Sequence, residues 1–208
     1  NNNDRPGILL SSAIEKYANF YGVACGEKNV LFTNNDSAYE TAISLYQKGI
    51  NIEAVIDNRE EIDSKLIKET EKNNIKVYKG YTIVDTSGYK RINKVSIMQL
   101  SKDGQKAIGS KISISCDCLG ISGGWTPAVH LFTQSGGKLK FRDEDQVFIP
   151  NIYPSDQISI GSCNGDFTLD EILSTVPKTL KEFLNLKKTD YEDLEIKSSF
   201  NKSKRNIW

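Results

Sequence analysis

The sequence predicts an α/β fold in which helices cover a Rossmann-like parallel sheet, an antiparallel β-meander follows, and a smaller unit completes the chain. Two observations predict this class. As far as residue 80, short apolar runs alternate with helical patterns, which is the order of a doubly wound sheet. Over residues 81–115, apolar and polar residues alternate instead, with turn signals at 86–88 and 102–104, as in antiparallel hairpins.

The first 80 residues are expected to form the parallel sheet and its helices. Apolar residues from Ile8 to Tyr21 recur at helical spacing, so we expect an amphipathic helix that Asp4 and Pro6 begin and Gly22 ends. The elements that follow are expected as a strand at 29–33, a helix at 36–48, a strand at 52–56 ending on Asp57, a helix at 60–73 and a strand at 74–80.

The pattern of apolar, polar and turn residues changes after the meander. A buried strand is expected at 116–121, ending at the run Ser122-Gly123-Gly124, and a short helix from Pro127. The run "DQISIGSCNGDFTLDEIL" predicts a strand, a glycine turn and a helix. We therefore expect a Rossmann-like NAD(P)-binding-type domain with a leading helix at 1–124, a second unit at 125–186, and a polar linker to a later domain at 187–208.

Composition and charge disfavour several partners. Lysine and arginine (27) balance aspartate and glutamate (27), so no overall charge favours nucleic acid or an anionic membrane. No apolar run approaches the roughly 20 residues of a membrane helix, and no signal segment opens the chain. We expect a cytoplasmic protein that binds neither nucleic acid nor membrane. The chain opens "NNNDRP" and closes in a polar stretch, so both ends are expected to continue in a longer protein.

The cysteines and the single histidine show no pattern typical of a metal site. Cys116 and Cys118 are one residue short of a Cys-x-x-Cys pair, so reduced thiols are expected. His130 has no serine or cysteine nucleophile beside it in the sequence. We therefore expect no metal site, and we expect His130 to be a core or interface residue and not a base.

The first candidate site is the turn in "FTNNDSAYETA", directly after a buried strand. Such turns present unpaired backbone N–H groups that bind phosphate, and glycines normally let a pyrophosphate approach. This turn has no glycine, and Asp36 places a negative charge at the positive helix end. Asp57 stands where an acidic residue would hold a ribose hydroxyl, with Arg59 close by. Asn34, Asn35 and Asp57 are thus candidates for a weak nucleotide site, but we favour the alternative, in which the turn mainly caps the helix.

The second candidate site is the run "SIGSCNGDFTLDEIL". Gly161 and Gly165 lie between an expected strand and a helix that begins near Thr168, which again aims backbone N–H groups at a ligand. The pattern is weak by itself. Its alternative is a tight turn in which Asp166 or Thr168 caps the helix.

Four runs in order resemble the alpha subunits of heterotetrameric sarcosine oxidases: "RPGILLSSAIEKYANFYGV", "VLFTNNDSAY", "SGGWTPAVHLFTQSGGKL" and "IGSCNGDFTL". The strings "TNNDSAY" and "SGGWTPAVHL" are unusual, and the resemblance extends nearly end to end. These subunits are similar to the pyridine-nucleotide-dependent disulfide reductases, in which a nicotinamide domain is inserted into a flavin-binding domain. The resemblance implies such an inserted domain at 1–124 and the C-terminal part of the flavin-like domain at 125–186.

The resemblance also implies cofactors and partners. NAD is expected where the reductases hold FAD, with its adenosine end on a Gly-x-Gly-x-x-Gly turn in a missing N-terminal part of the same domain. FAD and FMN are implied in the complex but not in this chain, and the other subunits of a heterotetramer are the implied partners. The positions implied to line the NAD are Gly161, Ser162, Gly165, Phe167 and Leu169.

The implied activity is the oxidative demethylation of sarcosine to glycine, with transfer of the one-carbon unit to tetrahydrofolate and release of hydrogen peroxide. The chain alone is expected to be inactive. Two other functions stay open. One is an independent NAD(P)-binding reductase module that uses Asp57 and the turn at Asn34 and Asn35. The other is a non-catalytic assembly domain in which Trp125 and His130 face a partner subunit.

Overall fold

A computed structural model describes residues 4–154 and 156–184 of the chain. The described residues form two compact units, of which the first runs to Gly124 and the second begins at Trp125. The linker expected at 187–208 lies outside the described residues.

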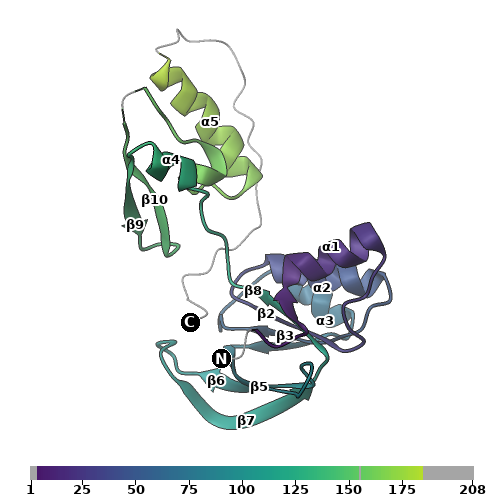
Figure 1. Ribbon diagram of the computed structural model, residues 1–208. Coiled ribbons are helices and arrows are strands. Elements are labelled where there is room, and N and C mark those ends of the chain that lie inside the picture. Colours follow the sequence, from purple (N-terminus) through teal and green to yellow (C-terminus); the bar gives the residue numbers. More distant parts are fainter. Residues whose placement is uncertain (1–3, 155, 185–208) are drawn as a thin grey trace. The chain divides into compact units, whose positions relative to one another are not determined.

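The first unit is built on a five-stranded parallel sheet (Figure 1). Its strand order is β1-β8-β2-β3-β4, and each neighbouring pair runs parallel. The strands are β1 (Ile8–Leu10), β8 (Cys118–Ser122), β2 (Asn29–Thr33), β3 (Ile52–Asp57) and β4 (Lys76–Lys79). Because β8 joins the sheet between β1 and β2, residues more than a hundred positions apart become neighbours.

The sheet lies between helices and a meander (Figure 1). One face carries α1 (Ser11–Tyr21), α2 (Ser37–Gln47) and α3 (Lys65–Lys72), and the other carries the antiparallel strands β5 (Tyr81–Ser87), β6 (Lys94–Leu100) and β7 (Ala107–Ser115). The predicted α/β class, with its parallel sheet and antiparallel meander, is confirmed.

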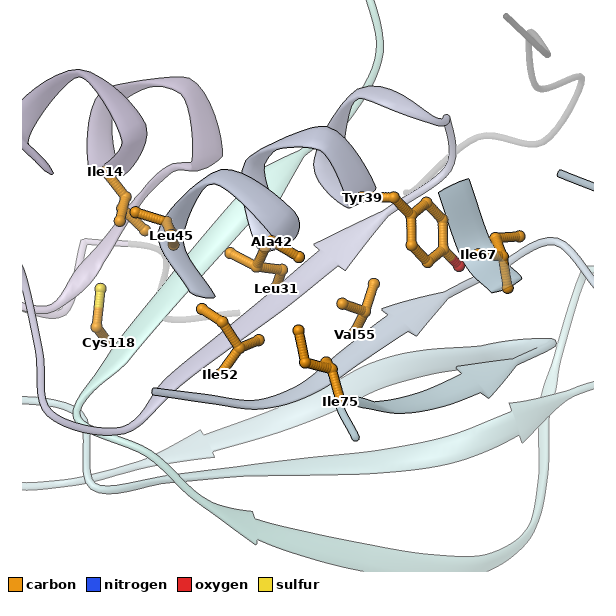
Figure 2. Close-up of a cluster of buried hydrophobic side chains, with 10 residues drawn as sticks. All are labelled: Ile14, Leu31, Tyr39, Ala42, Leu45, Ile52, Val55, Ile67, Ile75 and Cys118. Carbon is orange, nitrogen blue, oxygen red and sulfur yellow. The ribbon is translucent and has the colours of Figure 1, made fainter. Parts of the chain in front are cut away.

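The central strand β2 is buried on both faces, as expected for a parallel strand between two layers. Leu31 packs among the helices, whereas its neighbours Val30 and Phe32 pack toward the meander, because successive side chains of a strand point to opposite faces. Figure 2 shows the helix-side cluster, which consists of Ile14, Leu31, Tyr39, Ala42, Leu45, Ile52, Val55, Ile67, Ile75 and Cys118.

The second unit is smaller and has a smaller core. It contains the short helix α4 (His130–Gln134), the antiparallel hairpin of β9 (Lys138–Arg142) and β10 (Val147–Ile152), the 3₁₀ turn η1 (Gly161–Asn164) and the helix α5 (Leu169–Phe183). Its buried apolar residues are Phe132, Val147 and Ile149, and the Phe132 ring lies 5.0 Å from that of Tyr153.

Two expectations for the first unit were wrong at helix starts. The leading helix begins at Ser11, since residues 8–10 pair with β8 as a strand and sheet pairing outweighs their helical spacing. The helix expected from residue 60 begins at Lys65, because Ser64 is extended and its hydroxyl is held by Asp36.

Three expectations for the second unit also differ. The strand expected before Gly161 is absent from the described sheets, although Ile160 has extended dihedrals. The strand β10 was not predicted, and its Pro150 lies at a register irregularity of the hairpin, where proline is tolerated. The helix expected from Pro127 begins at His130.

Replacing Leu31 with alanine is expected to lower the free energy of unfolding by about 2 to 5 kcal/mol, because the fully buried side chain leaves a cavity between sheet and helices. Leu10→Ala is the control in the same unit, since Leu10 is 64% exposed. Urea unfolding followed by circular dichroism measures both. Equal losses for the two variants would contradict this packing.

Candidate functional site

The carboxyl ends of three parallel strands meet at the first candidate site. Thr33 of β2 is paired in register with Asp57 of β3 on one side and with Ser122 of β8 on the other. In open parallel sheets this edge is where nucleotides bind. The structure therefore brings together the residues that the sequence proposed here, including Asn34 and Asn35, which follow Thr33 directly.

Three backbone N–H groups of the asparagine turn, residues 33–37, are bonded within the protein. The Asn34 N–H donates to the Ser122 carbonyl (3.4 Å) and the Asn35 N–H to the Thr33 hydroxyl (3.0 Å). The Ser37 N–H donates to the amide oxygen of Asn35 (3.0 Å), so Asn35, not Asp36, caps α2. The N–H groups that would receive a phosphate thus have internal acceptors.

The two asparagine side chains fill the space that glycine would leave open. Both are almost completely buried. The Asn35 amide donates to the carbonyl and to the hydroxyl of Ser122, each at 3.2 Å, and the Asn34 amide donates to the Gly123 carbonyl at 3.2 Å. These bonds join the turn after β2 to the end of β8.

A buried charge cluster lies behind the turn. Arg59 is held between two aspartates: its Nη2 is 2.8 Å from Asp36 Oδ1 and 2.7 Å from Asp57 Oδ2. Both aspartate side chains are completely buried, and 9% of the arginine side chain is exposed. Tyr39 donates its hydroxyl to Asp57 (2.9 Å), and Ser64 donates to Asp36 (3.0 Å). We call these five residues the Arg59 cluster.

The Asp57 carboxylate has no acceptor position left for a ribose hydroxyl. Its Oδ1 accepts from the backbone N–H of Arg59 (2.9 Å) and from Nε (3.1 Å), and its Oδ2 accepts from Nη2 and from Tyr39. A carboxylate offers about four lone-pair positions, and all are used. Burial and the neighbouring Asp57 charge also raise the pKa of Tyr39, so the phenol stays a donor. These residues do not fit a dinucleotide.

The glycine turn, residues 161–169, forms the second candidate site. Gly161 (φ +68°) and Gly165 (φ +89°) adopt the left-handed conformation that favours glycine. A Cβ on Gly161 would have only Ile172 as a neighbour, at 4.0 Å, so the backbone is open on that side. A Cβ on Gly165 would lie 2.7 Å from Arg142 Nη2, which donates to the Gly165 carbonyl.

A complete capping box begins α5. Thr168 accepts from the Glu171 N–H, and Glu171 Oε2 accepts from the N–H groups of Phe167 (3.0 Å) and Thr168 (3.1 Å). The expectation that Thr168 caps this helix is confirmed. Because the Glu171 carboxylate takes the position of an anion at the helix end, a ligand of this turn would contact its side chains and glycine backbone.

The implied lining residues of the second site differ in exposure. Ser162 is exposed and Leu169 is 63% exposed, whereas Gly161 and Gly165 are buried and Phe167 is half-buried. Arg142 braces the turn from β9 and was not predicted from the sequence. Its hydrogen bonds to Asp145 raise its pKa, so the guanidinium stays charged. The exposed part of this turn thus consists of one hydroxyl and one apolar side chain, beside open space at Gly161.

The cysteines are free thiols in the described structure, and Cys116 and Cys118 are buried. Burial raises the pKa of both thiols to about 12. Residues 4–154 and 156–184 hold no group of three or more histidine, cysteine, aspartate or glutamate side chains that could bind a metal ion. In the same residues, no helix has both the length and the apolar character to cross a membrane.

The crowding at Gly165 predicts a difference between two glycine variants. Gly165→Ala is expected to destabilise the chain by about 1 to 3 kcal/mol more than Gly136→Ala, because both positions are left-handed but only Gly165 is packed against Arg142 and Ile149. Chemical unfolding of the two variants measures this difference. Equal stabilities would show that Arg142 does not brace the turn.

Cys116 and Cys118 are expected to resist alkylation. With a pKa of about 12, each thiol forms thiolate as the pH rises toward 12, so roughly one part in 10,000 is reactive at pH 8. Mass spectrometry after iodoacetamide treatment at pH 8 should find both unmodified in the native chain and modified in urea. Modification of the native thiols at the unfolded rate would contradict the buried positions.

Comparison with curated proteins finds relatives over most of the chain. It is 35% identical over 176 residues to sarcosine oxidase subunit alpha of Corynebacterium sp. (strain P-1), and 32% identical over 174 residues to that of Corynebacterium sp. (strain U-96). Each match covers 84% of this chain and 18% of the relative. The subunit of Rhizobium meliloti (strain 1021) is 29% identical over 153 residues, which are 71% of this chain and 14% of that subunit.

Solved structures share the fold at low identity. L-proline dehydrogenase from P. horikoshii matches with a TM-score of 0.52 and 18% identity, over 86% of this chain and 31% of that one. Thioredoxin reductase from T. acidophilum matches with a TM-score of 0.50 and 18% identity, over 76% and 53%. No family model matches the chain. The motifs and these relatives agree: the chain is related in sequence to a segment of the alpha subunit of sarcosine oxidase.

Proposed function

We propose that the chain is part of an oxidoreductase subunit of the sarcosine oxidase type and that its glycine turn forms one wall of an NAD site. The relatives are sarcosine oxidase alpha subunits, and the fold is that of dinucleotide-dependent oxidoreductases. Because the chain spans 18% of the two relatives from Corynebacterium, the demethylation of sarcosine, the transfer to tetrahydrofolate and the release of hydrogen peroxide are proposed for the complete protein. FAD and FMN are assigned to other parts of it.

The observation that carries this proposal is the free surface of the glycine turn. Ser162 and Leu169 are exposed on either side of Gly165, and the left-handed Gly161 leaves open space at its backbone. N–H groups of both turns have internal acceptors, but in the asparagine turn of the first unit the Asn34 and Asn35 side chains are buried as well and the Asp57 carboxylate is fully bonded. The two candidate sites thus differ in the groups that they leave for a ligand.

Each residue of the glycine turn has a proposed task toward the cofactor. Gly161 lets the backbone approach it, and Gly165 gives room to the Arg142 side chain that braces the turn. The Ser162 hydroxyl bonds to a hydroxyl or phosphate oxygen, and Phe167 and Leu169 supply apolar contact. A nicotinamide dinucleotide supplies hydride-transfer chemistry when bound. The described residues bind and orient it, and we assign no catalytic residue among them.

Two alternative functions have specific observations attached. An independent NAD(P)-binding reductase module would use Asn34, Asn35 and Asp57, whose polar atoms are already bonded. A non-catalytic assembly domain would use Trp125 and His130, and both side chains are exposed. Neither observation offers a surface that fits a dinucleotide as the glycine turn does.

The proposal predicts that Leu169→Asp weakens NAD binding by the complete subunit at least tenfold, because a carboxylate repels phosphate and removes the apolar contact. Leu131→Asp is the control, since Leu131 is 81% exposed in the same unit but outside the turn. Titration calorimetry measures both affinities.

Loss of binding in Asp57→Ala, with Leu169→Asp unchanged, would instead favour the independent reductase module. A complete subunit that binds no NAD would favour the assembly domain.

A further inference from the structure

We propose that the carboxyl edge of the parallel sheet in the first unit is a self-occupied nucleotide site, in which the Arg59 cluster and the asparagine turn replace the ligand. The fold has the strand ends and the helix start of a dinucleotide site. Its bonding groups, however, are satisfied by the chain's own side chains. The unit therefore stays closed without a nucleotide and does not bind one.

The charge of the cluster excludes a phosphate. Two carboxylates, Asp36 and Asp57, surround the single guanidinium of Arg59, and all three side chains are at most 9% exposed. Because charges interact strongly where water is excluded, a phosphate entering beside this excess of negative charge would be repelled. In a typical site the same helix end carries glycines and no buried carboxylate.

The cluster also connects secondary-structure elements at the sheet edge, as a bound ligand would. Arg59 connects Asp36, at the start of α2, with Asp57, at the end of β3. Ser64, the residue before α3, bonds to Asp36, and the Arg59 carbonyl accepts from the N–H of Gly80, directly after β4. Four elements are thereby held at one point, so the edge needs no cofactor to keep its shape.

The first test observes Arg59 in the unmodified chain by nuclear magnetic resonance. Its Nε–H donates to Asp57 in a buried position, so we expect a slowly exchanging signal at neutral pH. That signal should not move when NAD, NADP or ADP is added at millimolar concentration. A nucleotide-dependent shift of this signal would overturn the proposal.

The second test uses variants of the cluster. Arg59→Lys keeps the charge but loses the planar fork. Asp57→Asn replaces one acceptor oxygen with an amide NH₂ that faces the donors of Arg59 and Tyr39. Each is expected to lower Tm by about 10 °C, as for other buried pairs in a chain of this size. Asp63→Asn is the matched control: its side chain is 85% exposed in an ion pair with Lys68, so Tm should change by about 2 °C or less.

Nucleotide affinity separates this proposal from the function proposed for the glycine turn. If NAD binds to the chain, Arg59→Lys and Asp57→Asn should leave its dissociation constant unchanged within twofold. If the chain and both variants bind no NAD, that result also agrees with a closed sheet edge. A tenfold change in affinity in either variant, without a fall in Tm, would refute a self-occupied site whatever the glycine turn binds.

Discussion

The buried ion pairs of Arg59 with Asp36 and Asp57 are the constraint on which the first unit depends. They fix the end of β3 against the start of α2, and through Ser64 they set the residue at which α3 begins. Burying three charges is costly unless each is paired and hydrogen-bonded. Here both Asp57 oxygens and Asp36 Oδ2 accept hydrogen bonds, and Asp36 Oδ1 is ion-paired with Arg59, so the edge of the sheet is closed.

The two units differ in the groups that they leave accessible to a ligand. The first unit has a parallel sheet whose carboxyl edge resembles a nucleotide site, but the groups that this edge would offer to a ligand are bonded internally. The second unit has a small core, yet its glycine turn leaves Ser162 and Leu169 exposed beside left-handed backbone. We therefore propose the glycine turn, not the sheet edge, for a dinucleotide site in the complete protein.

Much of the fold could be predicted from the local residue pattern, whereas the pairing of strands far apart in the sequence could not. The strands at 29–33 and 52–57 have apolar runs bounded by turn residues, and the meander has a period of two, so both were visible in the sequence. Residues 8–10 have helical spacing and become a strand only because β8, over a hundred residues later, pairs with them. The residues of the first site were found, but their closure was not, since Asp57 and Arg59 give the same sequence signal for a ribose site and for a buried pair.

The central claim is that a dinucleotide contacts the glycine turn and not the edge of the parallel sheet. Hydrogen–deuterium exchange of the complete subunit, with and without NAD, tests it most directly. The account predicts slower amide exchange at residues 161–169 and unchanged exchange at residues 33–37. Protection that rises at 33–37 and stays constant at 161–169 would contradict it.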